Sequence, residues 1–245
     1  MKPSAITVCV EFSDILAITL PRNAKHFERI VVVSSFADEY TPRVVATIPN
    51  AELFQTNDFY LDGAVFNKGR ALESGFDVLG RRGWICVLDA DIVLPRNMNL
   101  APAQIGNLHT PRRRMLADIS RWPEVVDNHQ DWDLLPRQDA DAFPGYFQLF
   151  HADDPVLKSR PWYETNWRHA GGADSMFSNR WSPRSRVRPP FEVLHLGEDG
   201  KNWCGRATEF VSGSLHPQAG ARAAELAAML AARDPDDKLL RSEKL

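Results

Sequence analysis

Asp89 and Asp91 are the side chains in this sequence with the clearest capacity for chemistry. They follow the apolar run 84–88, which reads as a buried strand, and a second apolar run ending at Pro95 comes directly after them. Two carboxylates this close repel each other unless a cation or a proton relieves them. Acids at the carboxyl end of a buried strand lie where open α/β sheets bind ligands, and such acids commonly hold a divalent ion on a diphosphate. The pattern therefore predicts a metal–diphosphate site, although the same spacing also caps turns in ordinary loops.

Two later segments could add groups to this site. His195 ends the strand-like run 191–195, and a neutral imidazole can complete a metal site begun by carboxylates or simply satisfy a local hydrogen bond. Asp174 follows Gly171 and Gly172 and opens a predicted helix. At that position it would serve either as a general base beside an acceptor hydroxyl or as a plain helix cap.

Cationic and aromatic side chains could contact an anionic ligand. Lys68 and Arg70 lie at a predicted helix start, where positive side chains and free N–H groups form an anion site. Trp203 offers a flat face for a sugar ring, and Arg206 offers a planar fork for phosphate. Ordinary solvation or packing is the alternative for all four residues.

The bulk composition limits the class of protein. The chain has 245 residues, 44% of them hydrophobic and 25% charged, with a net charge of −3, so it is not a general binder of nucleic acid. Three cysteines without a close pair argue against a disulfide framework. The sequence shows no signal-peptide pattern and no apolar run of about 18 residues. We therefore expect a cytoplasmic protein, in a bacterium or a virus-infected host cell, with no membrane partner.

The elements that must position these residues alternate between strands and helices. This alternation predicts an α/β fold with a mostly parallel sheet flanked by helices, whereas residues 96–145 show no long regular element. We expect one domain over residues 1–215 and a C-terminal helix and tail over residues 216–245. The predicted strands are 6–10, 29–34, 43–48, 84–88, 146–150 and 191–196, and the predicted helices are 14–20, 66–79 and 218–233.

Several of these motifs together resemble one family. Residues 87–91 look like an Asp-Xaa-Asp motif, and residues 171–177 resemble the Gly-Gly-Glu-Asp-Asp-Asp-Ile-Phe stretch of galactosyltransferase-type enzymes. Asn67-Lys68-Gly69 resembles the helix before the acidic strand, and His195 falls where many members place a C-terminal histidine on the metal. The chain is therefore similar to nucleotide-sugar glycosyltransferases of the GT-A fold, in the family-two and galactosyltransferase-like group. It also resembles glycosyltransferases found in bacteriophage genomes.

This resemblance implies a Rossmann-like GT-A domain that moves a sugar from a nucleoside diphosphate, with a UDP-sugar as the favoured donor. Mn²⁺ or Mg²⁺ would be held by Asp91 and His195, with Asp89 on the metal or on the ribose. Asp174 would be the base of an inverting reaction, although Ala173 replaces the acid that precedes this residue in the family.

The resemblance also implies a set of donor contacts. Lys68, Arg70 and Arg206 would add positive charge near the phosphates, and Trp203 would face the donor. Asp38, which follows the second strand, would contact the nucleobase.

The acceptor is either a glycan or small molecule, or a hydroxymethylpyrimidine in phage DNA. Arginine clusters at 112–114 and 180–188 could hold DNA, and the interleaved Trp162, Trp167 and Trp181 could stack on a flipped base. The plain alternative is that these arginines are solvated loop faces.

Two other functional classes fit the same fold. A sugar nucleotidyltransferase would need a glycine-rich, cationic loop after the first strand, whereas residues 11–14 contain neither a glycine nor a cation. A non-catalytic GT-A-like binding module would not need a metal–diphosphate site. Diphosphate binding therefore separates this module from the two enzymes.

Overall fold

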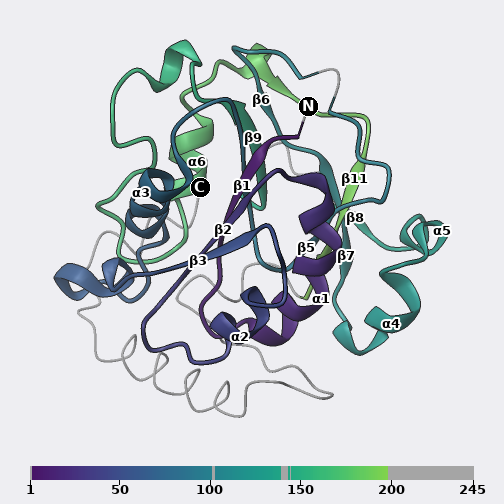
Figure 1. Ribbon diagram of the computed structural model, residues 1–245. Coiled ribbons are helices and arrows are strands. Elements are labelled where there is room, and N and C mark those ends of the chain that lie inside the picture. The colour runs from purple at the N-terminus through teal and green to yellow at the C-terminus, as the bar shows by residue number, and fades with distance from the viewer. Residues whose placement is uncertain (1, 101–102, 139–142, 144, 198–245) are drawn as a thin grey trace, which may run out of the picture.

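A seven-stranded sheet forms the centre of the computed structural model, which describes residues 2–100, 103–138, 143 and 145–197. Four neighbouring strands are parallel, in the order β3-β2-β1-β4, and three further strands continue the sheet beyond β4 as β9, β6 and β10 (Figure 1). Strand β9 runs antiparallel to β4, so the sheet is mixed at this end. The strands are β1 (Ser4–Val8), β2 (Ile30–Ser34), β3 (Ala51–Gln55), β4 (Trp84–Leu88), β6 (Leu108–His109), β9 (Phe147–His151) and β10 (Arg186–Val187).

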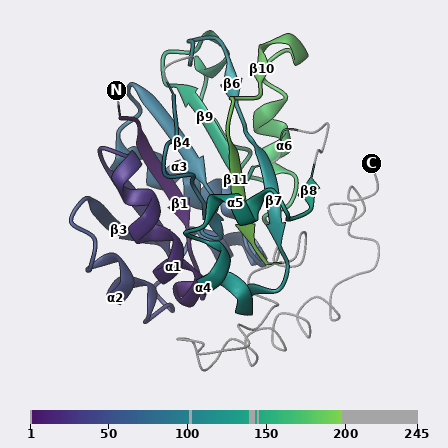
Figure 2. The same ribbon diagram turned by 90° about the vertical axis from the view of Figure 1, so that its right-hand side faces the viewer.

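A second sheet of four strands lies beside the end of β4 (Figure 2). Its order is β5-β11-β7-β8, and β11 runs parallel to β7 and antiparallel to β5. Because β5 begins directly after Asp91 and pairs with β11, the segment around His195 is returned to the acidic end of β4. The strands are β5 (Ile92–Val93), β7 (Arg112–Leu116), β8 (Arg137–Gln138) and β11 (Glu192–Leu196).

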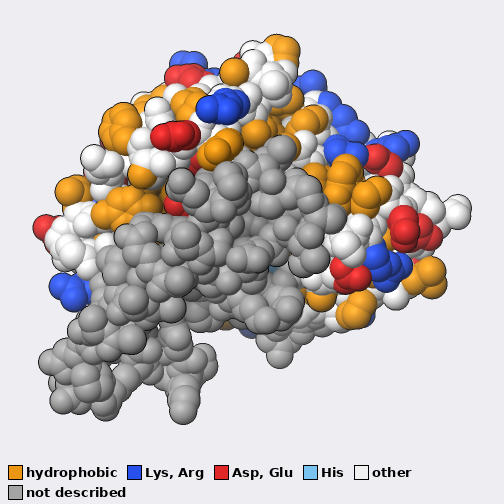
Figure 3. All heavy atoms as spheres, turned by 90° about the horizontal axis from the view of Figure 1, so that it is seen from below, with side chains coloured by type: hydrophobic (Ala, Val, Ile, Leu, Met, Phe, Trp, Pro, Cys, Tyr) orange, Lys and Arg blue, Asp and Glu red, His pale blue; other side chains and the backbone are white. Residues whose placement is uncertain are grey.

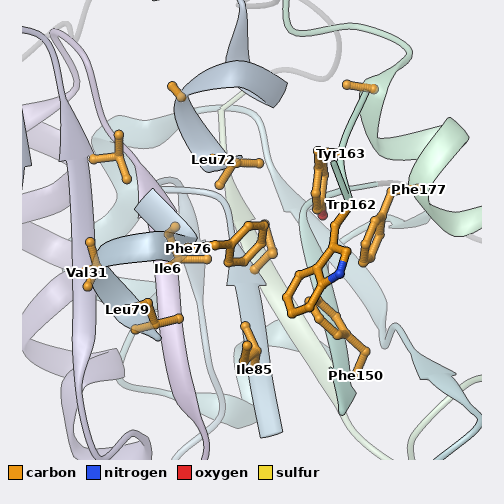
Figure 4. Close-up of a cluster of buried hydrophobic side chains, with 14 of the residues drawn as sticks. Ile6, Val31, Leu72, Phe76, Leu79, Ile85, Phe150, Trp162, Tyr163 and Phe177 are labelled. Atoms are coloured by element: carbon orange, nitrogen blue, oxygen red, sulfur yellow. The ribbon is translucent and has the colours of Figure 1, made fainter. Parts of the chain in front are cut away.

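Helices cover both faces of the central sheet because alternate strand residues are apolar on both sides. Helix α3 (Lys68–Leu79) packs on one face through Leu72 and Phe76, in the cluster that Figure 4 shows with Ile6 and Ile85. Helix α1 (Ser13–Asn23) packs on the other face, where Leu16 and Leu20 join the cluster around Ala5 and Val32. The remaining helices are α2 (Thr41–Val45), α4 (Trp122–Val125), α5 (His129–Trp132) and α6 (Ala173–Ser178), with short 3-10 turns at Ala24–His26, Asp58–Gly63, Ile119–Arg121, Pro155–Leu157 and Pro183–Ser185.

The predicted α/β class, with a mostly parallel sheet flanked by helices, is confirmed. The strand predicted at 43–48 is wrong: α2 occupies Thr41–Val45 and the strand comes later, at Ala51–Gln55. Pro42 suits the first turn of a helix, so the valines after it are helical despite their preference for strands.

Residues 96–145, where no long element was expected, contain short strands and helices, among them the five-residue strand β7. This strand begins with three consecutive arginines, so the hydrophobic pattern did not predict it. The predicted helix at 218–233 and the tail lie outside the described residues. Within the described part of the chain, no helix is long and apolar enough to cross a membrane.

Candidate active site

The two predicted acids lie at the carboxyl end of β4, between the two sheets. The backbone N–H of Asp89 donates to the carbonyl of Tyr146 at 3.0 Å, which extends the β4–β9 pairing by one residue. Asp91 comes directly before β5. Asp89 therefore continues the central sheet, and Asp91 leads into the second sheet.

Lys68 joins two of the predicted site residues. Its Nζ lies 2.7 Å from Oδ1 of Asp89 and 3.2 Å from Oδ2 of Asp174, and its side chain is only 8% exposed. Burial by itself would lower the pKa of Lys68, but the charges of Asp174 and Asp89 outweigh it and raise the pKa above its ordinary value. Lys68 is therefore a buried ammonium ion held between two carboxylates.

Two glycines let the elements carrying Lys68 and Asp174 approach each other. A Cβ on Gly69, in the first turn of α3, would lie 2.1 Å from the carbonyl oxygen of Glu164. A Cβ on Gly145 would lie 1.9 Å from Cγ of Asp174. Both positions lack space for a methyl group, so glycine lets α3 lie against the segment at Glu164 and lets Asp174 of α6 lie against the chain before β9.

The carboxyl group of Asp89 titrates unusually close to neutrality. Burial raises its pKa, the Lys68 ammonium lowers it, and the charges of Asp91 and Asp174 raise it again, with the result that the pKa is about 6. Three carboxylates near one lysine leave an excess of negative charge. The site therefore favours binding of a further cation or a proton.

Asp91 and His195 form the second part of the site. Nε2 of His195 lies 3.4 Å from Oδ2 of Asp91, and the N–H of Leu196 donates to the carbonyl of Asp91 at 2.9 Å. Burial disfavours the charged form of each residue. The charge and the hydrogen bond of the partner together have the larger effect on the pKa in both cases. The pKa of Asp91 is lowered by His195, and the pKa of His195 is raised by Asp91.

These residues fit a divalent metal ion that is only partly coordinated by protein. Oδ1 of Asp91 is buried and has no hydrogen-bond partner among the described residues, and an imidazole nitrogen faces the same carboxylate. In the described ranges, no group of three or more His, Cys, Asp or Glu side chains is placed to hold a metal. One carboxylate and one imidazole suit Mn²⁺ or Mg²⁺ when diphosphate oxygens and water complete the coordination. Asp89 instead contacts Lys68.

The other residues predicted to contact the donor either make different interactions or lie outside the described residues. Asp38 is buried, and its carboxylate accepts hydrogen bonds from the N–H groups of Glu11, Tyr40 and Thr41, so it organises the loops after β1 and β2. The large hydrophobic side chain exposed on the loop after β2 is Phe36, at 63%.

Arg70 forms an ion pair with Asp62 at 2.9 Å. Trp203 and Arg206 lie outside the described residues, so the structure places neither of them relative to the acids.

The aromatic residues predicted to stack on a flipped base are mostly in the core. Trp162 is 4% exposed and packs with Phe150 (Figure 4). Trp181 is 1% exposed and also packs with Phe150, so burial contradicts that role for both. Trp167 is half-buried, and its ring lies 2.9 Å from the position of a Cβ on Gly172. Of the three tryptophans, Trp167 therefore remains available beside Asp174.

The arginine cluster at 112–114 is divided by strand β7 rather than forming a solvated loop. Arg112 is exposed, Arg113 is buried, and Arg114 forms an ion pair with Glu192. In the second cluster, Arg180 and Arg186 donate to backbone carbonyls. Seen from below, the described part of the surface carries basic side chains together with acidic ones (Figure 3). The structure therefore gives no support to a continuous basic surface at these positions.

Sequence reasoning missed two buried polar residues near the site, Gln148 and Tyr163, and placed a third, Arg113, in a cluster that could hold DNA. Gln148 donates to the carbonyl of Asp174 at 3.1 Å and accepts a hydrogen bond from the hydroxyl of Tyr163, which fixes the start of α6. Arg113 lies over the ring of Tyr146 at 4.6 Å. Neither β7, with the sequence RRRML, nor β9, with the sequence FQLFH, alternates regularly between polar and apolar residues, so the sequence pattern gave no signal for these contacts.

Comparisons with known proteins give no family. No family model matches the chain, and no curated protein matches it. Solved structures similar to it include an inositol-1-phosphate CTP transferase from T. maritima, with 8% identity, a TM-score of 0.44, and coverage of 80% of this chain and 85% of that one. A 4-diphosphocytidyl-2C-methyl-D-erythritol synthase from Anaerococcus prevotii has 13% identity, a TM-score of 0.40, and coverage of 81% and 90%.

A third similar structure is glucosyl-3-phosphoglycerate synthase from Mycobacterium tuberculosis, in complex with Mn²⁺, uridine diphosphate and glucosyl-3-phosphoglycerate. It has 13% identity, a TM-score of 0.46, and coverage of 94% of this chain and 78% of that one. With TM-scores this low, the likeness decides neither substrate nor reaction, which we infer from the geometry of the site.

Proposed function

We propose that this protein is a metal-dependent glycosyltransferase of the GT-A type, which moves a sugar from a nucleoside diphosphate to an acceptor hydroxyl. One observation carries the proposal: the Asp91–His195 pair and the Asp89–Lys68–Asp174 cluster meet at the carboxyl end of β4. The first group offers a place for a metal-bound diphosphate, and the second offers a fixed carboxylate for proton transfer.

Each residue then has a distinct role. Asp91 and His195 would hold Mn²⁺ or Mg²⁺, which when bound offsets the charge that develops on the leaving diphosphate. Oδ2 of Asp174 faces Lys68, and Oδ1 is a buried atom without a partner among the described residues. The Asp174 carboxylate would take the acceptor's proton once the bound acceptor reaches it. The acceptor oxygen bonds to the anomeric carbon as the bond from that carbon to the diphosphate oxygen breaks. Direct displacement inverts the anomeric carbon.

The loop after β1 supports glycosyl transfer over nucleotidyl transfer. Its residue Glu11 adds a negative charge, and its N–H group is used by Asp38 at 2.7 Å. A nucleotidyltransferase must bind a triphosphate here with glycines and cations, which an acidic, internally bonded loop does not provide.

The surroundings of Asp174 support a glycan or small-molecule acceptor over a flipped base. Trp162 and Trp181 are used in the core, so the aromatic pair needed to stack on both faces of a base is missing at those positions. The half-buried Trp167 beside Gly172 offers one apolar face, which suits a sugar ring. We therefore take a hydroxyl of a saccharide or small molecule as the acceptor.

The test is a thermal-shift screen of nucleotide sugars, UDP-sugars first, with and without Mn²⁺. We expect one donor to raise the melting temperature only when the metal is present. The Asp91→Asn variant should lose this shift while its melting temperature without ligand stays near that of the wild type. A wild-type protein that responds to no donor, or responds equally without metal, would refute the proposal.

A further inference from the structure

Helix α1 carries two buried polar side chains, Thr19 and Asn23, that bond to the segment around the acids. Since they are four residues apart, they lie on one face of α1, the helix beside β5 (Figure 1). A buried hydroxyl or amide needs a hydrogen-bond partner. Both side chains bond to the backbone of residues 90–94 rather than to their own helix. They therefore connect α1 to the chain that carries Asp91.

Thr19 holds the peptide that joins Ala90 to Asp91. Its Oγ1 donates to the carbonyl of Ala90 at 2.6 Å. Ala90 and Asp91 are the central residues of a turn, which the N–H of Ile92 closes by donating to the carbonyl of Asp89 at 3.3 Å. The closing bond leaves the carbonyl of the central peptide unused. The hydroxyl of Thr19 supplies the partner of this carbonyl and fixes the orientation of the peptide.

Reversal of this central peptide is the movement that Thr19 opposes. A turn with the reversed peptide needs a positive φ at its third residue, which is Asp91. Asp91 has a negative φ, since Glu11 and Asp62 are the described residues other than glycine with a positive one. Reversal would rotate the backbone before Asp91 and change the direction of its side chain. A fixed peptide therefore keeps the carboxylate facing His195.

Asn23 holds the chain that leaves the turn. Its Nδ2 donates to the carbonyl of Ile92 at 2.7 Å, and its Oδ1 accepts the N–H of Leu94 at 2.9 Å. The amide thus covers the free edge of β5, which is an edge strand of the second sheet. On the other edge β5 pairs with β11, where the N–H of Leu196 donates to the carbonyl of Asp91 at 2.9 Å. The segment is held from both sides.

Such support is needed because the carboxylate of Asp91 is in an unfavourable place. Its Oδ1 is buried and has no hydrogen-bond partner in the described part of the chain. Burial of an unpartnered charged oxygen is costly, so a free turn would relax until that oxygen reached water. The hydrogen bonds from α1 prevent this relaxation. They keep Asp91 and His195, which come from different sheets, ready for a common ligand.

We propose that Thr19 and Asn23 are positioning residues, which hold the turn at Asp91 in the geometry that binds a metal-bound diphosphate. This inference rests on the proposed function, since it takes Asp91 and His195 to be the metal ligands. Helix α1 acts here only through the backbone of residues 90–94. Groups of this kind, which orient a metal ligand without touching the metal, commonly change metal affinity when they are removed.

Calorimetric titration of Mn²⁺ into protein with excess uridine diphosphate tests the assignment, and the melting temperature of each ligand-free variant is measured alongside. Thr19→Val removes the hydroxyl while keeping a similar shape, and Thr19→Ser restores the hydroxyl. We expect Thr19→Val to weaken Mn²⁺ binding by about tenfold and Thr19→Ser by less than about threefold.

Asn23→Ala and Asn50→Ala form a matched pair for the second residue. Each loses two hydrogen bonds from a side-chain amide to the backbone, because Asn50 donates to the carbonyls of Ala24 and Phe27. Those carbonyls lie before β2, at the opposite end of the parallel strands from the acids. Both variants should lower the melting temperature. We expect Asn23→Ala to weaken Mn²⁺ binding by about tenfold and Asn50→Ala by less than about twofold.

Wild-type Mn²⁺ affinity in Thr19→Val or in Asn23→Ala would overturn the assignment for that residue, which would then serve only the fold. An equal loss in Thr19→Ser and Thr19→Val would show that the hydroxyl does not matter. An equal loss in Asn50→Ala would mean that any destabilisation weakens binding, and it too would overturn the assignment. Absence of Mn²⁺-dependent binding in the wild type is a separate result, because it refutes the proposed function and this inference with it. If Asn23→Ala does not fold, the two Thr19 variants decide.

Discussion

Asp174 has two carboxylate oxygens in different surroundings, and this difference suits a general base. Oδ2 lies 3.2 Å from Nζ of Lys68, and Oδ1 has no partner in the described part of the chain. We predict that Asp174→Asn keeps donor binding within about twofold and lowers sugar transfer by about 10²- to 10⁴-fold, since only proton removal is lost. Calorimetry of the donor and an assay of product formation measure the two effects.

Ser175→Ala is the matched control, because Ser175 is exposed and is the next residue of α6. Its transfer rate should equal that of the wild type. Transfer by Asp174→Asn at more than a tenth of the wild-type rate would mean that another group removes the proton.

At the scale of single residues, the sequence identified which side chains could do chemistry but not which of them contact each other. Asp89, Asp91, Asp174 and His195 stood out because each lies at the end of a predicted strand or the start of a predicted helix, where α/β sheets bind ligands. The bond from Lys68 to both Asp89 and Asp174 spans 21 and 106 residues of sequence, and no local pattern reports such contacts. The phosphate contact predicted for Lys68 remains a prediction, while the structure shows a lysine engaged by two carboxylates.

The position of helix α3 depends on a contact that its own sequence does not predict. In an isolated helix, alanine in place of Gly69 would stabilise the helix by about 1 kcal/mol. In the folded protein the added methyl would meet a backbone oxygen at 2.1 Å, and backbone cannot rotate away. We predict that Gly69→Ala destabilises the protein by about 1–3 kcal/mol and reduces transfer, because α3 must shift and carries Lys68 with it.

Denaturant unfolding gives the free energy, and the transfer assay gives the activity. The comparison variant is Asp77→Ala, since Asp77 is exposed on the same helix and gains the same alanine preference. It loses exposed ion pairs with Arg81 and Arg160 and should change stability by less than about 1 kcal/mol. A Gly69→Ala protein as stable as the wild type would show that α3 and the segment at Glu164 have room to separate.

The strand predictions were wrong or missing where the usual preference of the side chains differs from the backbone structure that forms. The valines at 44 and 45 favour a strand, but Pro42 begins a helix there. Strand β7 consists largely of arginine, yet it pairs along its full length with β11 because Arg113 and Arg114 find partners on opposite faces. Charged residues on a strand are readable only when the opposite strand is known, and β11 lies about eighty residues later in the chain.

The described part of the chain is built around a central sheet and a second sheet, and the proposed metal would join them. Asp91 follows β4 of the central sheet, and His195 lies on β11 of the second sheet. A ligand that binds both residues stabilises the folded state by an amount that grows with its concentration. We predict that Mn²⁺ with uridine diphosphate raises the melting temperature of the wild type, and that adding a chelator reverses the rise.

His195→Ala should remove most of this rise, because the link from the second sheet is lost. His151→Ala is the control, since His151 lies on β9, where it packs on Trp84 at the other end of β4. It should respond to Mn²⁺ as the wild type does. If His195→Ala keeps the full metal-dependent rise, the ion is held by the central sheet alone and the pairing of β5 with β11 serves only to build the fold.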